Sequence, residues 1–320
     1  MNFPQNAQEG TVIKSTGSWY TVRMQDNTLL QCRIVGKFRL EELKLTNPIA
    51  VGDQVAVEPE GENAGIIRKI LPRKNYVIRQ FPRRKHVLLL LASNIDQAVL
   101  LVTITQPNLK PGFIDRFLLM TEPYDIPVIL VFNKADLYQE GDWNMYEYLQ
   151  SIYEPIGYTM LATSAVDGQG LEALREHLKD KISLVSGQSG VGKSSLINSI
   201  QPALQLRTTE ISDYSGKGQH TTTFAEMFPL DFGGFIIDTP GIKTLAFNHL
   251  NAMDVAHNFR EFFALSADCK YPNCTHRNEP KCAVKTALEE EIVSPFRYSN
   301  YLAILDEIEN QNYWEIHSDI

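Results

Sequence analysis

One stretch of this 320-residue chain decides the fold: Gly187-Gln188-Ser189-Gly190-Val191-Gly192-Lys193-Ser194. It fits the pattern G-x-x-x-x-G-K-[ST] of a phosphate-binding loop. Residues 182–186 before it are apolar and β-prone, and residues 195–200 after it have helical spacing. A glycine-rich turn that matches by chance lacks this strand-loop-helix context, so the stretch predicts an α/β nucleotide-binding domain.

The residue types of this loop suit a bound nucleotide. The glycines let the backbone curl, so that successive N–H groups point at phosphate oxygens near the positive end of the next helix. Lys193 would reach the β- and γ-phosphates, which makes it a catalytic candidate, and the Ser194 hydroxyl would bind Mg²⁺. The candidate nucleotide-binding residues here are Gly187, Gln188, Ser189, Gly190, Val191, Gly192, Lys193, Ser194 and Ser195.

Length and composition narrow the class of protein. A chain of this length predicts two or three domains. No run of 18 uncharged apolar residues exists, and the N-terminus lacks a basic start followed by an apolar stretch, so we expect a cytoplasmic protein without a membrane partner. A net charge of −8 argues against general affinity for nucleic acid, although a local basic patch could still bind it.

Residues 1–85 are predicted to form an oligonucleotide-binding (OB) fold that binds RNA, with an SH3-like barrel as the alternative. Five β-prone runs, at 11–14, 19–24, 29–34, 54–58 and 65–71, and one helical stretch at 38–45 support a small barrel. Three aromatic residues could stack on bases or fill the barrel interior: Trp19, Tyr20 and Phe38. Cys32 is expected to be an ordinary barrel residue.

A basic run follows the barrel. Residues 66–86 contain no acidic side chain and eight basic ones: Arg68, Lys69, Arg73, Lys74, Arg79, Arg83, Arg84 and Lys85. Such segregation in an acidic protein favours contacts with a phosphate backbone. A solvated linker, punctuated by Pro72 and Pro82, is the other interpretation.

The predicted nucleotide domain, residues 86–248, contains two further loops. Asn133-Lys134-Ala135-Asp136 follows a buried strand at 127–132 and resembles the guanine-recognition loop N-K-x-D of GTPases. Guanine has donors at both N1 and the 2-amino group, so Asp136 can accept two hydrogen bonds from it. In that family Lys134 would lie over the base and Asn133 would join this loop to the phosphate loop. Ser164 and Ala165, after a strand at 158–161, resemble the loop whose Ala N–H contacts the guanine oxygen.

Two later segments resemble the switches of GTPases. Residues 218–223, Gly-Gln-His-Thr-Thr-Thr, match the first switch, where Thr222, or alternatively Thr221 or Thr223, would bind Mg²⁺. Asp238 would hold Mg²⁺ through water, and the Gly241 N–H would sense the γ-phosphate. Because N-K-x-D precedes the phosphate loop, the domain is circularly permuted. The second switch then leads directly into the C-terminal domain, so the γ-phosphate could move that domain.

Residues 249–320 are predicted to form a helical zinc-binding domain, with helices near 252–264, 283–292 and 295–308. The spacing Cys269-x4-Cys274-x-His276-x5-Cys282 supplies three thiolates and one imidazole, which suits one tetrahedral structural Zn²⁺. The intervening residues are too polar for a cysteine-rich core.

This order of domains resembles the bacterial circularly permuted ribosome-assembly GTPases, the family of small-ribosomal-subunit-dependent GTPase A. The resemblance covers about residues 10–310 and rests on the motifs described above. It implies a cytoplasmic GTP hydrolase that binds the 30S subunit late in its maturation, contacts 16S rRNA and is stimulated by the ribosome. The expected cofactors are Mg²⁺ with GTP or GDP and one Zn²⁺, and we expect a monomer. The family usually has Ser where this chain has Thr239.

The group that positions the attacking water stays open. Many GTPases place Gln after the D-x-x-G glycine, but this chain has Ile242, so slow intrinsic turnover is expected. His220 is the candidate within the chain, as an alternative to a ribosomal group or to a mere exposed loop histidine. An RNA-binding protein without turnover and a GTP-using phosphotransferase are the alternative functions.

Overall fold

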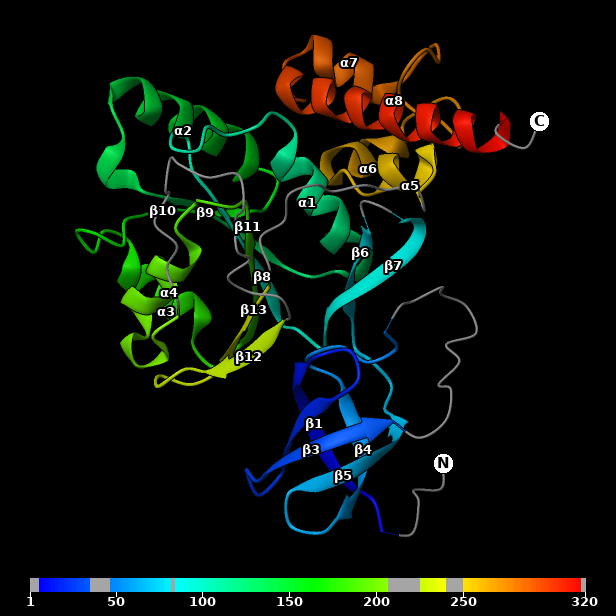
Figure 1. Ribbon diagram of the computed structural model, residues 1–320. Coiled ribbons are helices and arrows are strands. Elements are labelled where there is room, and N and C mark those ends of the chain that lie inside the picture. Colours follow the sequence, from blue (N-terminus) through cyan, green and yellow to red (C-terminus); the bar gives the residue numbers. More distant parts are fainter. Residues whose placement is uncertain (1–5, 35–46, 82–83, 207–224, 240–249, 318–320) are drawn as a thin grey trace.

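The computed structural model describes residues 6–34, 47–81, 84–206, 225–239 and 250–317. A β-barrel lies at one end of the molecule, a sheet with flanking helices lies in the middle, and a group of helices lies beyond it (Figure 1). Within the described ranges, no helix is both long and apolar enough to cross a membrane.

The N-terminal unit is a closed five-stranded barrel. Its strands are β1 (Gln8–Ser15), β2 (Tyr20–Met24), β3 (Leu29–Ile34), β4 (Gln54–Glu60) and β5 (Ala64–Ile70). They pair in the order β1-β2-β3-β5-β4, and a β1–β4 ladder closes the ring. β3 and β5 are parallel, whereas the other pairs are antiparallel. All five predicted strands are confirmed, and the strand order is that of an OB fold.

The barrel aromatics differ in exposure. Tyr20 is 1% exposed, and its hydroxyl donates to Asn47 Oδ1 at 2.6 Å, so it belongs to the interior with Cys32. Trp19 is 51% exposed and remains available for stacking. Phe38 and the predicted helix at 38–45 lie outside the described residues.

The central sheet is built from β8 (Gln97–Val102), β9 (Val128–Asn133), β10 (Thr159–Thr163), β11 (Ile182–Gly187), β12 (Glu226–Pro229) and β13 (Phe235–Asp238). The strand order is β10-β9-β8-β11-β13-β12, and only β12 is antiparallel to its neighbour. Every residue of β8 and β9 is buried, because helices cover both faces. β12 also pairs with β1, which makes one continuous sheet with the barrel.

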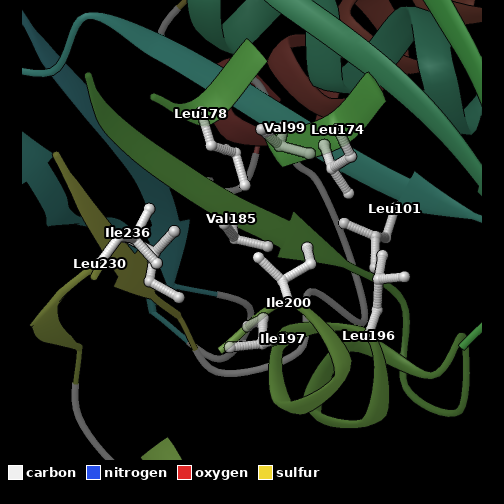
Figure 2. A pocket seen from close by; sticks show the side chains of 10 residues that line it. All are labelled: Val99, Leu101, Leu174, Leu178, Val185, Leu196, Ile197, Ile200, Leu230 and Ile236. Atoms are coloured by element: carbon white, nitrogen blue, oxygen red, sulfur yellow. The ribbon is translucent and has the colours of Figure 1, made fainter. Parts of the chain in front are cut away.

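Helices cover the two faces of this sheet. α3 (Leu171–Leu178) and α4 (Lys193–Ile200) pack on one face, where their leucine and isoleucine side chains meet Val99, Leu101 and Val185 around a small apolar gap (Figure 2). α1 (Phe113–Thr121) and α2 (Glu140–Tyr153) cover the other face. Short 3-10 helices are η1 (Glu122–Tyr124), η2 (Ala135–Leu137) and η3 (Pro202–Leu204).

A two-stranded hairpin, β6 (Tyr76–Phe81) and β7 (Arg84–Ser93), connects barrel and central sheet. The domain boundary expected at residue 85 lies inside β7. Val77, Leu91 and Ala92 belong to the same hydrophobic cluster as α1.

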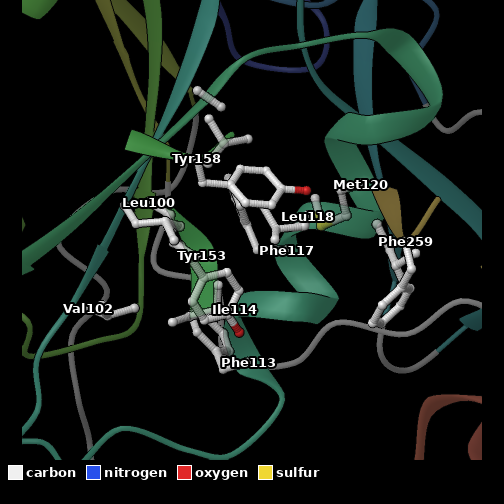
Figure 3. Packing of buried hydrophobic residues seen from close by; sticks show 14 of the residues in the cluster. Leu100, Val102, Phe113, Ile114, Phe117, Leu118, Met120, Tyr153, Tyr158 and Phe259 are labelled. Carbon is white, nitrogen blue, oxygen red and sulfur yellow. The ribbon is translucent and has the colours of Figure 1, made fainter. Parts of the chain in front are cut away.

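Over residues 250–317, the C-terminal part consists of four helices: α5 (Ala252–His257), α6 (Arg260–Ser266), α7 (Ala283–Glu289) and α8 (Pro295–His317). The predicted helix at 252–264 is broken, because Phe259 adopts an extended backbone conformation between α5 and α6. Its ring enters the cluster that contains Phe117 and Tyr153 of the central domain (Figure 3). The C-terminal helices therefore share a core with α1 and α2.

Candidate functional site

The phosphate loop joins the end of β11 to the start of α4, as its sequence context predicts. Gly190 and Gly192 have φ values of 87° and 86°, which L side chains rarely adopt. A Cβ on Gly187 would lie 2.6 Å from the Leu101 carbonyl oxygen. These glycines are therefore required by the conformation and packing of the loop.

Lys193 lies between the phosphate loop and the end of β13. Its Nζ donates to the Asp238 carboxylate and to the Thr239 carbonyl. β11 and β13 are parallel neighbours, and Val185 is the Cα partner of Asp238, so the two motifs emerge at one edge of the sheet. The cation and the carboxylate are thus in direct contact at the position where phosphate chemistry is expected.

The contacts of Thr239 explain why threonine can stand where the family usually has serine. It is buried, and its hydroxyl donates to the Val185 carbonyl at 3.0 Å and lies 3.4 Å from Ser186 Oγ. A serine hydroxyl can make the same bond. The hydroxyl anchors the end of β13, where the predicted second switch begins, to β11.

Asn133 connects three segments. Its Nδ2 donates to the Val191 carbonyl of the phosphate loop at 2.8 Å, and its Oδ1 accepts from the Thr163 hydroxyl at 3.1 Å. A Cβ on Gly192 would lie 2.6 Å from Asn133 Nδ2, so glycine allows this close approach. The contact expected between the N-K-x-D loop and the phosphate loop is present in this geometry.

The rest of the predicted base loop converges on the same edge. Ser164 Oγ donates to Asp136 Oδ1 at 2.7 Å and accepts N–H groups from residues 166 and 167. Lys134 has a φ of 64°, and its Nζ donates to the Gln106 carbonyl at 2.6 Å. Burial lowers the pKa of Lys134, although the Asp136 charge opposes that shift. Ala165 follows Ser164, and its carbonyl accepts from the Ser199 hydroxyl of α4 at 3.3 Å.

A second candidate site is a metal centre in the C-terminal helices. The ligand atoms of Cys269, Cys274, His276 and Cys282 all lie within 4.8 Å of one another. His276 Nδ1 lies 3.4 Å from Cys282 Sγ and 3.7 Å from Cys269 Sγ, and those two sulfurs are 4.0 Å apart. Ligands of tetrahedral zinc, at 2.0–2.3 Å from the ion, lie roughly 3.5–3.8 Å apart, so the cluster fits this geometry.

Surrounding groups hold the cluster in place. Burial raises the pKa of the Cys274 thiol to about 12, so a cation is needed to keep it as a thiolate. The Tyr298 hydroxyl donates to the His276 carbonyl at 2.7 Å, and the Tyr301 hydroxyl donates to the Thr275 carbonyl at 2.6 Å. Burial of Glu279 opposes its ionisation, but hydrogen bonds from Thr275 and nearby backbone N–H groups lower its pKa to about 2.

Comparison with known proteins decides the family. The sequence profile described as RsgA GTPase matches residues 70–248, and the profile described as RsgA N-terminal domain matches residues 9–67. The chain belongs to the RsgA GTPase family. It is similar to the "Small ribosomal subunit biogenesis GTPase RsgA" of Bacteroides fragilis, at 47% identity over 95% of this chain and 98% of the relative. The protein of the same name from Flavobacterium psychrophilum is 47% identical over 97% of this chain and 96% of its own length.

Solved structures of the family share this architecture. The crystal structure of YjeQ from Thermotoga maritima matches with a TM-score of 0.76 at 36% identity, covering 94% of this chain and 98% of the other. YloQ, described as a circularly permuted GTPase, matches with a TM-score of 0.72 at 30% identity, covering 97% and 99%. The enzyme is accordingly a GTPase with a permuted nucleotide domain, as the motif order predicts.

Several predicted family residues lie outside the described residues. They are His220, Thr222 with its alternates Thr221 and Thr223, Gly241 and Ile242. Conversely, sequence reasoning missed Tyr138 and Gln106, which contact Asn133 and Lys134. Tyr138 lies two residues after the N-K-x-D motif, but no sequence pattern indicates that the Tyr138 hydroxyl donates to the first residue of that motif.

The basic run of this family member is partly used within the protein. Arg73 binds the buried Asp53 carboxylate through Nε and one terminal nitrogen, at 2.6 and 2.7 Å. Arg68 pairs with Glu58 at 2.6 Å and Lys74 with Asp96 at 3.2 Å. Arg73 thus has a structural role, which separates it from residues available to a phosphate backbone.

Proposed function

We propose that this GTPase acts in maturation of the small ribosomal subunit, binding the 30S particle and 16S rRNA and hydrolysing GTP under ribosomal stimulation. The names of relatives aligned over nearly the whole chain support this role. The observation that carries the nucleotide site is the 2.8 Å bond from Asn133 to Val191, which brings a guanine-type loop and a phosphate loop to one sheet edge.

In the proposed site, each element has one task. Asp136 accepts the N1 and 2-amino hydrogens of guanine, while Lys134 lies over the base and the Ala165 N–H contacts the guanine oxygen. The N–H groups of residues 187–195 surround the phosphates, and Lys193 neutralises the β- and γ-oxygens. Ser194, Thr222 and Asp238 would hold Mg²⁺, which when bound offsets the charge that develops on the phosphates. Gly241 senses the γ-phosphate, and His220 orients the attacking water.

For the metal centre we propose one structural Zn²⁺. Three sulfurs and one imidazole nitrogen at tetrahedral spacing complete a closed coordination shell, so the ion would stabilise the fold rather than take part in hydrolysis.

For rRNA we propose a surface made by the basic run from Arg68 to Lys85 and by the C-terminal metal-binding helices. The test variant neutralises Arg79, Arg83, Arg84 and Lys85 and keeps Arg68, Arg73 and Lys74, whose pairs with acidic side chains are part of the fold. The fourfold variant should bind 30S more weakly, with a shallower dependence on salt, because fewer counterions are released. Equal salt slopes for variant and parent would favour the linker interpretation. We further propose that the enzyme is a cytoplasmic monomer with no membrane partner.

The experiment that tests the function is multiple-turnover phosphate release with and without 30S subunits. We expect slow release alone and a gain of two or more decades with 30S, which requires about 3 kcal/mol of added transition-state stabilisation. His220→Ala should bind GTP and 30S but lose most of the gain. Undiminished stimulation of that variant would place the water-positioning group on the ribosome, and no stimulation of the parent would contradict the proposed role.

Base recognition has its own test. Asp136→Asn should lose preference for GTP and gain xanthosine triphosphate, whose 2-oxo group accepts a hydrogen bond. Competition binding measures this exchange. A variant that still prefers GTP as strongly as the parent would show that residues 133–136 do not bind the base.

A further inference from the structure

Tyr138 turns back onto the base loop. Its ring is 7% exposed, and its hydroxyl donates to the Asn133 carbonyl at 3.1 Å and accepts the Ile104 N–H at 3.2 Å. Both partners are backbone groups that are buried here, so each would be costly to leave without a hydrogen bond. The hydroxyl therefore joins the start of the base loop to the segment after β8.

The turn that Tyr138 closes has an unusual backbone. Lys134 is in the left-handed region, and N–H groups of Leu137 and Tyr138 donate to the carbonyls of Lys134 and Ala135 at 3.0 and 3.1 Å. The Tyr138 hydroxyl then returns to Asn133, which completes a ring of contacts around the loop. Asp136 lies within this turn, and Ser164 Oγ donates to its Oδ1 at 2.7 Å, so the turn and Ser164 together position the carboxylate.

The segment at 104–107 is tied to the base loop a second time. Lys134 Nζ donates to the Gln106 carbonyl at 2.6 Å. A Cβ built on Gly190 of the phosphate loop would lie 3.8 Å from Pro107 Cδ, so this segment also borders the phosphate loop. The Thr103 hydroxyl donates to the Pro107 carbonyl at 2.6 Å and stabilises its fold.

We propose that Tyr138 is a positioning residue for guanine: its hydroxyl fixes the base loop against residues 104–107, so that Asp136 can accept both guanine donors. This inference rests on the base-loop assignment proposed above. Burial raises the pKa of Tyr138 to about 12, so the hydroxyl stays protonated and able to donate at neutral pH.

The test compares Tyr138→Phe with Tyr146→Phe in the full-length protein. Tyr146 is also buried in the aromatic cluster of this region, its ring 5.7 Å from that of Trp143, but no hydrogen bond among the described residues joins its hydroxyl to the base loop. The measured quantities are the affinities for GTP, GDP and inosine triphosphate, which lacks the 2-amino group, together with kcat and KM.

Tyr138→Phe should bind GTP and GDP about tenfold more weakly, on the scale of one lost buried hydrogen bond. The affinity for inosine triphosphate should fall by a smaller factor, because this nucleotide offers Asp136 only one hydrogen-bond donor. KM should rise while kcat at saturating GTP stays unchanged, and Tyr146→Phe should resemble the parent. All ligands are measured on the same sample, so partial unfolding would not change their affinity ratio.

The outcomes distinguish the positioning role of Tyr138 from the assignment of residues 133–136 as the base loop. If Asp136→Asn exchanges GTP for xanthosine triphosphate but Tyr138→Phe keeps the parent ratio of GTP to inosine triphosphate, the positioning role is wrong. If Asp136→Asn keeps its GTP preference, the base-loop assignment is wrong and the inference fails with it.

Discussion

The barrel and the C-terminal helices flank the same GTPase domain but are joined to it in different ways. The barrel has its own hydrophobic cluster, built around Tyr20, Val22 and Cys32. The C-terminal helices have none of their own among the described clusters: Phe259, Phe262 and Tyr301 belong to the cluster of α1 and α2. Figure 3 shows Phe259 among the residues of this cluster. The barrel is thus a separately packed unit, whereas the C-terminal helices complete the core of the central domain.

The polar contacts reinforce this difference. Arg297 of α8 is fully buried and donates to Asp115 of α1 at 2.5 Å and to Glu261 of α6 at 2.7 and 2.9 Å. Asp115 also accepts from Tyr153 at 2.7 Å and from Asn300 at 2.6 Å. The barrel instead meets β12 through the short β1–β12 ladder and the half-exposed pair Lys14–Glu226, and it meets β7 where the Ser93 hydroxyl donates to the buried Asp53 carboxylate at 2.6 Å.

The comparison bears on the switch mechanism. The segment that the sequence predicts to be the second switch precedes α5 in the chain, so a response to the γ-phosphate would have to reach the C-terminal helices through their packing. Because these helices share a core with α1, they can move only together with α1 or by exposing apolar side chains.

The largest expected effect comes from the metal. Cys274→Ser combined with Cys282→Ser should abolish metal binding, which in small zinc sites is worth on the order of 10 kcal/mol of folding free energy. Elemental analysis should fall from one zinc per chain to none. Hydrogen exchange should accelerate at 267–290 but not in the barrel. The fold-change in GTP affinity should be smaller than the fold-change in exchange rate at 267–290. Unchanged metal content would refute the four-ligand assignment.

Next comes the buried charge cluster. Arg297→Met should destabilise the protein by about 3–5 kcal/mol, because Asp115 and Glu261 lose their cation in a buried site. Urea unfolding measures this loss. Arg116→Met is the matched control, since its pair with Glu307 is partly exposed and should be worth about 1 kcal/mol or less. Equal losses for the two variants would show that burial of the Arg297 cluster adds nothing to the attachment of the C-terminal helices.

A smaller effect is expected in the segment after β5, which leads from the barrel to the β6–β7 hairpin. Arg73→Met leaves Asp53 with the Ser93 hydroxyl at 2.6 Å and the Ala50 N–H at 2.9 Å, so we expect a loss of about 2 kcal/mol. Limited proteolysis should cleave near residues 71–75 faster, while GTP binding stays near that of the parent. A loss as large as that of Arg297→Met would show that the barrel is held as tightly as the C-terminal helices.

The smallest effect should come from the edge of the sheet. Lys14→Met should cost at most about 1 kcal/mol, because the Lys14–Glu226 pair at 2.8 Å is partly exposed to solvent and screened by salt. Thermal unfolding at low and high salt should give nearly the same curve for this variant. A strong salt-dependent change in GTP turnover would instead indicate that this pair transmits the nucleotide state to the barrel.

Much of the fold could be predicted because its signals are local. The five barrel strands follow from β-prone runs, and the strands before residues 133, 164 and 187 follow from short apolar stretches. The four candidate metal ligands lie within fourteen residues, so their spacing alone predicts the site. The break at Phe259 was missed, because the amphipathic pattern continues through it while the ring is drawn into a core built by distant residues.

The sequence by itself determined which chemistry each loop can perform, since glycines, a lysine, a carboxylate and thiolates act through their residue type and close spacing. Only the tertiary structure decided which groups form hydrogen bonds and ion pairs with these loops and with the helices around them. Tyr138 bonds to Asn133 five residues away and to Ile104 at a separation of 34, and Arg297 reaches Asp115 across 182 residues. Burial requires such partners, because a polar group removed from water must form hydrogen bonds with the groups that the folded chain brings near it.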